Sequence, residues 1–165
     1  MYHIDALSFP HIDRVGPVDD LSFLSDGSVE FIYACHVLEH FGRHEFQRVL
    51  NEWSRVLAPG GVLRLAVPDF EMCAKLYAEG RLAGGISDVI GLIVGGQKDP
   101  YDFHKIIFDR PSLTQALLRA GFQSVREWNW RETDHSDMDD YSQAYLPHMQ
   151  QATGDLVSLN LEGVK

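Results

Sequence analysis

The sequence predicts an α/β fold with a mostly parallel sheet and an antiparallel last strand. Residues 31–35 are a short apolar run, which is typical of a strand covered on both faces. Residues 43–57 place apolar side chains on one helical face, and residues 62–67 form a second apolar run after a Pro-Gly-Gly turn. A strand, helix and strand in this order form a right-handed crossover, and ligands bind beyond the carboxyl ends of such strands. Residues 36–41 and 68–71 should therefore lie at the working edge of the sheet.

The first twenty residues contain two acids that each follow a predicted strand end. Met1–Asp5 reads as the end of a strand, and Arg14–Val18 reads as a short edge strand. In dinucleotide-type folds an acid at a strand end binds the ribose hydroxyls about 20 residues after a glycine-rich loop, so Asp5 is a candidate and that loop would lie before Met1. Asp20 is a candidate for the adenine amino group, or alternatively for capping a helix or turn.

The second half of the chain alternates short helices, loops and strands. Residues 71–94 contain two amphipathic stretches separated by glycines, and a polar, aromatic loop with His104 follows. His104 is a candidate acid or base, or a solvated loop histidine. The remaining predicted elements are a helix over 112–120 capped by Ser112, a strand within 122–130, a turn-rich acidic loop over 131–150 favoured as solvated rather than metal-binding, and an antiparallel strand over 156–164.

Composition restricts the class of partner. The length of 165 residues predicts a single domain over 1–165. A net charge of −10 argues against nucleic acid, because a phosphate backbone requires a basic face. The sequence has neither a membrane-spanning apolar run nor a secretory leader pattern. The two cysteines, Cys35 and Cys73, read as buried thiols rather than a disulfide framework, so we expect a cytoplasmic protein with no membrane partner.

Several motifs together resemble one family. They are Asp19-Asp20-Leu21, the run from Asp26 to Phe41, the Trp53–Gly61 segment with its R-V-L-x-P-G-G turn, Ala120-Gly121-Phe122 and the closing residues 158–162. Together they resemble class I S-adenosylmethionine-dependent methyltransferases, in particular the bacterial type associated with glycosyltransferases. The resemblance implies a Rossmann-like methyltransferase fold. The first strand and glycine loop of that family have no counterpart, so we expect a truncated fold that lacks the strand between those ending at Asp5 and Cys35.

The resemblance also implies a cofactor site and an acceptor site. By position, Asp5 matches the ribose-binding acid, and Asp20 and Leu21 match the adenine contacts. Ala34, Cys35 and His36 match the residues that line S-adenosylmethionine near its methyl group. The region 71–111 matches the part that covers a small-molecule acceptor, so we interpret it as a lid, although a packing helix pair is the alternative.

His36, Glu39 and His40 also form an H-x-x-E-H pattern, which occurs in inverted zinc peptidases. On a helix, the two histidines would share a face and reach one zinc ion, with Glu39 beside them as a base. A third ligand would have to come from elsewhere, and Gly42 would interrupt such a helix. The alternative for His40 is a partly buried histidine that caps a short helix.

The sequence therefore predicts methyl transfer to an oxygen or nitrogen of a small acceptor that could contain a sugar. The sulfonium is already a good leaving group, so the protein mainly aligns the reactants. His36 first, and His104 second, would act as the base for a hydroxyl acceptor. An alternative is an inactive relic that acts in self-association or partner binding. A missing strand predicts a homodimer in which another chain covers the gap. A further alternative is that Met1 is internal to a longer gene product.

Overall fold

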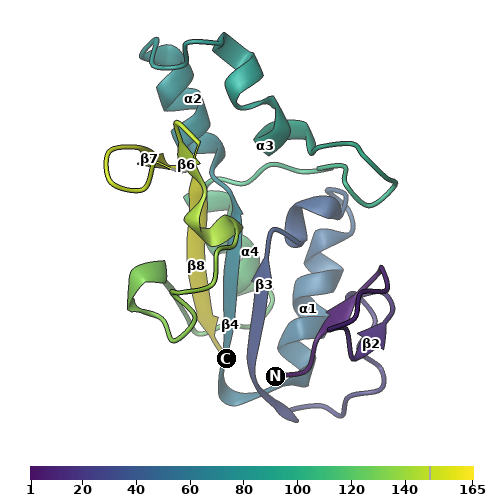
Figure 1. The fold of residues 1–165 in the computed structure, drawn as a ribbon. Coiled ribbons are helices and arrows are strands. Elements are labelled where there is room, and N and C mark those ends of the chain that lie inside the picture. The colour runs from purple at the N-terminus through teal and green to yellow at the C-terminus, as the bar shows by residue number, and fades with distance from the viewer. Residues whose placement is uncertain (149) are drawn as a thin grey trace.

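The computed structural model of the chain describes residues 1–148 and 150–165 (Figure 1). Residue 149, in the predicted acidic loop, lies outside the described residues. The strands are β1 (Ile4–Asp5), β2 (Arg14–Val15), β3 (Val29–Cys35), β4 (Leu57–Pro68), β5 (Ser124–Glu127), β6 (Tyr145–Leu146), β7 (Asp155–Leu156) and β8 (Ser158–Val164). The α-helices are α1 (Phe46–Val56), α2 (Phe70–Ala78), α3 (Ile90–Val94) and α4 (Arg110–Arg119), and the 3₁₀ turns are η1 (Leu38–His40), η2 (Gly85–Asp88), η3 (Trp130–Glu132) and η4 (Tyr141–Gln143).

A four-stranded sheet in the order β3-β4-β8-β5 forms the centre of the fold (Figure 1). β3 and β4 are parallel and are joined through α1, which confirms the predicted strand, helix and strand unit. β8 runs antiparallel to both β4 and β5, which confirms the antiparallel last strand. The carboxyl ends of β3 and β4 therefore meet at one edge, where Cys35 pairs with Ala66.

The first two strands form a separate sheet. β1 and β2 pair in parallel, with Ile4 opposite Arg14 and Asp5 opposite Val15. Within the described parts of the chain, β3 pairs with β4 alone, so its other edge has no partner strand. Phe31 on this strand remains 39% exposed. An unpaired edge leaves backbone N–H and C=O groups available to another strand.

Both faces of the sheet are covered, as the apolar runs predict. Alternate residues of β4 point to opposite faces, so Leu63 and Leu65 join one apolar cluster and Ala66 joins another. The first cluster includes the buried faces of α1 and α4. The second includes residues of the 128–145 segment. Ser142 and Tyr145 are buried there, so the prediction of a solvated loop over 131–150 is wrong for this part.

Two local details differ from the sequence-based expectations. α4 is capped by Asp109 rather than Ser112: the Asp109 carboxylate accepts the Ser112 N–H, and the Ser112 hydroxyl accepts the Asp109 N–H. This is a capping box, in which Ser112 is the third helical residue rather than the cap. The Pro-Gly-Gly turn lies within β4 as an irregularity, and a Cβ on Gly61 would lie 2.8 Å from the Ala58 carbonyl oxygen. That close approach requires glycine.

The segment from α2 to α3 extends beyond the carboxyl ends of β3 and β4 (Figure 1). The cap of α2 is Asp69, whose carboxylate accepts the Met72 N–H at 3.1 Å. Cys73 and Leu76 of α2 pack with Val89 and Val157 in a third apolar cluster. No helix in the described part of the chain is long and apolar enough to cross a bilayer.

Candidate functional site

The chain leaves β3 through a strained residue. His36 has φ of +51°, in the left-handed region that non-glycine residues seldom adopt. Its N–H donates to the Ala66 carbonyl at 2.8 Å, which extends the β3–β4 ladder by one bond before the chain turns into η1. Backbone strain of this kind is concentrated at functional sites.

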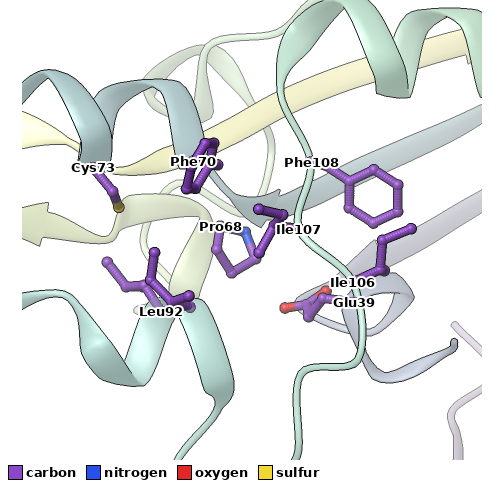
Figure 2. A pocket seen from close by; sticks show the side chains of 9 residues that line it. Glu39, Pro68, Phe70, Cys73, Leu92, Ile106, Ile107 and Phe108 are labelled. Carbon is purple, nitrogen blue, oxygen red and sulfur yellow. The ribbon is translucent and has the colours of Figure 1, made fainter. Parts of the chain in front are cut away.

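Glu39 of η1 is a buried carboxyl group without a hydrogen-bond partner. It is 1% exposed, and neither of its carboxylate oxygens makes a hydrogen bond. Its Oε1 lies 3.3 Å from His36 Nδ1 and 3.9 Å from His104 Nε2. The small cavity on another side of Glu39 is lined by apolar residues such as Pro68 and Ile106 (Figure 2). Burial raises the pKa of Glu39 to about 8.

His40 and His104 face each other beside this carboxyl group. Their ring centroids lie 4.9 Å apart at a nearly perpendicular angle. The Nδ1 atom of His40 lies 3.1 Å from the Phe103 carbonyl, and that of His104 lies 3.0 Å from the Leu92 carbonyl. A carbonyl oxygen only accepts, so Nδ1 carries the proton in both rings. Each Nε2 then has a lone pair.

Backbone hydrogen bonds join the two segments that carry these histidines. The Glu39 carbonyl accepts the Lys105 N–H at 2.8 Å and the Ile106 N–H at 3.4 Å. η1 therefore holds the loop that contains His104, although more than sixty positions separate the two in the sequence. Burial lowers the pKa of His104. Both predicted bases, His36 and His104, are thus brought to the same carboxyl group.

His36 is held by a ring stack as well as by its backbone. Its ring lies on Tyr141, with centroids 5.1 Å apart and planes 30° apart. Its Nε2 is buried and makes no hydrogen bond in the described part of the chain. Burial lowers the pKa of His36 to about 3, so the imidazole is neutral at pH 7. The same burial makes it a weak base.

An open cleft of about 930 Å³ lies next to these groups, within the range of small-molecule sites. Cys35, His36, His40 and His104 line it, together with Tyr141 and other residues of the η4 region. Burial raises the pKa of the Cys35 thiol to about 12. The thiol is therefore uncharged at neutral pH and offers a lining surface rather than a nucleophile.

Four of the predicted cofactor residues do not line this cleft. Ala34 is buried in the main apolar cluster. Asp5 ends β1, and its Oδ1 accepts the Leu7 N–H at 2.7 Å. Asp20 accepts the Ser22 N–H at 3.1 Å, the turn-capping role that was the alternative for it, and hydrogen bonds from Ser22 lower its pKa. The cofactor roles of these residues remain predictions.

Leu21 is positioned by α1. It is 5% exposed, its N–H donates to Glu52 at 2.8 Å, and its carbonyl accepts from the Arg55 guanidinium at 3.1 Å. Arg55 also donates to Asp26. The loop that carries Asp20 and Leu21 is therefore fixed to the exposed side of the helix rather than left mobile.

The H-x-x-E-H residues do not lie on one helix, so the zinc-peptidase arrangement considered for them is wrong. His36 lies before η1 in a left-handed conformation, and η1 spans three residues. His36 and His40 therefore do not share a helical face. The structure instead places His104 beside Glu39 and His40, and the three offer ligand atoms within 4.8 Å of one another.

Sequence reasoning missed Tyr141 as a residue of this site and placed Asp140 only in a generic acidic run. Tyr141 stacks on His36, and Asp140 accepts a hydrogen bond from the Tyr33 hydroxyl at 2.5 Å. Both contacts join residues about a hundred positions apart. Neither has a local pattern that could have revealed it.

Comparison with known proteins agrees with the fold. Residues 6–65 match the family model described as a methyltransferase domain. No curated protein matches the chain. A SAM-dependent methyltransferase from Archaeoglobus fulgidus is 12% identical with a TM-score of 0.59, and the match covers 98% of this chain and 74% of that protein. The chain thus has the mixed-sheet fold of class I methyltransferases.

Two further solved structures are similar. The 1,6-didemethyltoxoflavin-N1-methyltransferase of Burkholderia thailandensis, solved with bound 1,6-didemethyltoxoflavin and S-adenosylhomocysteine, is 13% identical with a TM-score of 0.56. The match covers 98% of this chain and 59% of that one. A SAM-dependent methyltransferase of Thermotoga maritima, described as a possible histamine N-methyltransferase, is 16% identical with a TM-score of 0.53, covering 93% of this chain and 64% of that one. This chain therefore spans less than two thirds of both proteins.

Proposed function

We propose that this chain transfers a methyl group from S-adenosylmethionine to a small-molecule acceptor. The observation that carries the proposal is the cleft of about 930 Å³ at the carboxyl end of β3, lined by Cys35, His36 and His104. In open α/β sheets this edge is where ligands bind. The matched family model and the shared fold support the same reaction class.

The chemistry asks little of the protein beyond alignment. The positively charged sulfur of S-adenosylmethionine leaves readily as a neutral thioether. The site therefore mainly has to hold the acceptor atom, the methyl carbon and the sulfur in line. A hydroxyl acceptor also has to lose its proton. His36 is the first base in this proposal and His104 the second, because both imidazoles line the cleft. Burial lowers the pKa of both rings, which keeps them neutral at pH 7 but makes each a weaker base.

The cofactor would extend from the cleft toward the first two strands. In this proposal Asp5 binds the ribose hydroxyls, and Asp20 and Leu21 bind the adenine. Ala34, Cys35 and His36 line the methyl end. Hydrogen bonds to Glu52 and Arg55 of α1 fix the backbone of Leu21, so in this proposal the loop keeps one conformation beside the cofactor. Region 71–111 would cover an acceptor that could contain a sugar, as in the glycosyltransferase-associated type.

A second candidate is an inactive protein that self-associates. The supporting observation is the outer edge of β3, which has no strand partner among the described residues. In this proposal the edge pairs with another chain in a homodimer. Self-association and methyl transfer are compatible, so the tests of the two are separate.

The first test is calorimetric titration of the chain with S-adenosylhomocysteine. We expect a dissociation constant in the micromolar range, lost in Asp20→Ala and kept in Asp134→Ala, which removes an exposed acid outside the cleft lining. Binding that survives Asp20→Ala would contradict the adenine assignment alone. No heat at millimolar ligand would contradict the methyltransferase proposal, and sedimentation of the same sample would then test the dimer.

A further inference from the structure

Glu39 presents an energetic problem that the methyl-transfer proposal does not resolve. Its carboxyl group is buried, and the described residues offer neither oxygen a hydrogen bond. Leaving a buried carboxyl without hydrogen bonds costs free energy, and leaving it ionised and unpaired costs far more. Among the described residues no arginine or lysine pairs with it, and its nearest basic groups are the His36 ring, with Nδ1 at 3.3 Å, and the His104 ring, with Nε2 at 3.9 Å. A cation at this place would supply the missing partner.

His40 and His104, which both line the cleft, each leave one ring nitrogen free to act as a metal ligand. Backbone carbonyls of Phe103 and Leu92 fix the proton of each ring on Nδ1. The lone pair of each Nε2 is thereby available on the other side of the ring. A second hydrogen bond of this kind is the usual support of a metal-bound histidine, because it fixes both the tautomer and the ring orientation.

The spacing of the three groups fits a small cation. One ligand atom each from Glu39, His40 and His104 lies within 4.8 Å of the other two. Ligand atoms bound tetrahedrally at ~2.1 Å from a metal ion lie roughly 3.4 Å apart. Side-chain rotations that move these atoms by about an ångström are therefore enough to form the site. Backbone bonds from Lys105 and Ile106 to the Glu39 carbonyl hold the two segments in register while the side chains move.

We propose that Glu39, His40 and His104 bind one divalent transition-metal ion, for which Zn²⁺ is the probe. Two imidazoles and a carboxylate are the donor set of catalytic zinc sites, which keep a fourth position open. Two of the three ligands, His40 and His104, line the cleft, so an ion that they bind would border it. The Nδ1 atom of His36 lies 3.3 Å from Glu39 Oε1 without forming a hydrogen bond, so His36 contacts the carboxyl group of the site but is not one of its three proposed ligands.

The role of the ion rests on the proposed function, whereas its binding does not. A bound cation in the cleft takes an acceptor hydroxyl as its fourth ligand and lowers the pKa of that hydroxyl. The hydroxyl proton passes to His36 or to solvent. The oxygen then forms a bond to the methyl carbon, the carbon–sulfur bond breaks, and S-adenosylhomocysteine leaves with the electron pair on sulfur. The acceptor class is therefore a hydroxylated small molecule.

The test is a titration of the chelator-treated 165-residue chain with Zn²⁺ in the absence of any nucleoside. We expect one equivalent per chain with a micromolar or tighter dissociation constant, and Co²⁺ should give visible absorption bands at the same stoichiometry. His40→Ala and His104→Ala should each weaken binding by about a hundredfold. His44→Ala, which removes an exposed histidine nearby in the sequence, should leave the affinity unchanged.

Nitrogen NMR of the wild-type imidazoles provides a readout that does not depend on the folding of variants. Zn²⁺ should shift Nε2 of two histidines and leave their protonated Nδ1 atoms bonded. No stoichiometric uptake by the folded wild type, uptake that both His40→Ala and His104→Ala retain, or micromolar displacement by Mg²⁺ would each overturn the inference. Binding of S-adenosylhomocysteine by the metal-free chain is measured separately, so failure of one proposal is distinguishable from failure of the other.

Discussion

The Tyr33 hydroxyl donates to Asp140 Oδ2 at 2.5 Å and so ties the middle of β3 to a loop that lies 107 positions later in the sequence. Asp140 also accepts the N–H and the hydroxyl of Ser142. The next residue, Tyr141, is the one that stacks on His36. This hydrogen bond therefore sets one wall of the cleft.

Replacing Tyr33 with Phe should loosen that wall without unfolding the chain. The change leaves the ring in place but removes a hydrogen bond to a charged acceptor, so we expect a loss of about 1–3 kcal/mol in the free energy of unfolding. Hydrogen exchange at residues 140–143 should accelerate more than exchange in α4. Uniform acceleration across both regions would contradict a local role for the bond.

His36→Gln should lower the rate of methyl transfer without preventing the chain from folding or binding S-adenosylhomocysteine. If His36 accepts the acceptor proton, the rate constant kcat with a hydroxyl acceptor should fall by about a hundredfold or more, while the affinity for S-adenosylhomocysteine changes little. The measurement is the steady-state rate together with a calorimetric titration. His44→Gln is the matched control, because His44 is an exposed histidine outside the cleft lining. An unchanged kcat in His36→Gln would exclude His36 as the base.

The buried carboxyl of Glu39 should make the metal-free chain less stable as the pH rises. Burial raises its pKa from 4.5 to about 8, so in this window the folded chain keeps a proton that the unfolded chain has lost. The free energy of unfolding therefore falls with pH. The facing groups His36 and His104 have lowered pKa values, so they make the free energy of unfolding rise with pH. That rise is nearly complete at the ordinary histidine pKa of 6.5 and adds little above it.

Between pH 6.5 and 8 the wild type should accordingly lose about 1–2 kcal/mol of unfolding free energy, at ~1.4 kcal/mol per pH unit while Glu39 stays protonated. Chemical denaturation of chelator-treated protein at several pH values measures this slope. Glu39→Gln should remove most of it, since an amide does not titrate. A wild-type curve that rises across the same window would show that Glu39 is ionised in the folded chain.

Arg55 offers a test of the adenine assignment that leaves Asp20 itself intact. Its guanidinium bonds the carbonyls of Leu21 and Leu24 and the carboxylates of Glu52 and Asp26. Arg55→Ala should free the loop and weaken S-adenosylhomocysteine binding by about tenfold if Leu21 contacts adenine. The control is Arg119→Ala, which removes an exposed arginine of α4 and leaves this loop untouched. Equal effects of the two variants would contradict a specific role for the loop.

Elements with a local pattern were predictable from the sequence. β3, α1 and β4 follow from uninterrupted apolar runs and one amphipathic stripe, and the antiparallel direction of β8 follows from its alternation. The cap of α4 was misplaced because Asp109 and Ser112 both have capping side chains and the backbone decides between them. The local sequence predicts that a helix forms more reliably than it predicts the residue at which the helix begins.

The sequence identified some residues of the site but not how they are arranged in space. His36 and His104 were named from their chemistry, yet nothing in the sequence indicates that both lie within 4 Å of Glu39. That proximity depends on the hydrogen bonds from Lys105 and Ile106 to η1. The position of Tyr141 similarly depends on the tie between Tyr33 and Asp140. Contacts between residues so far apart in the sequence depend on tertiary packing, which leaves no periodic pattern in the sequence.

The backbone bond from the Lys105 N–H to the Glu39 carbonyl also has a kinetic consequence. Because this bond and its neighbour at Ile106 fix the separation of η1 and the His104 loop, the entropy of bringing the ligands together is lost during folding rather than on binding. Such preorganisation favours binding, because less entropy is lost when an ion binds. Release of a bound ion would require local opening of the same two bonds, so its rate and the exchange rate of the Lys105 amide should change together across variants and temperatures.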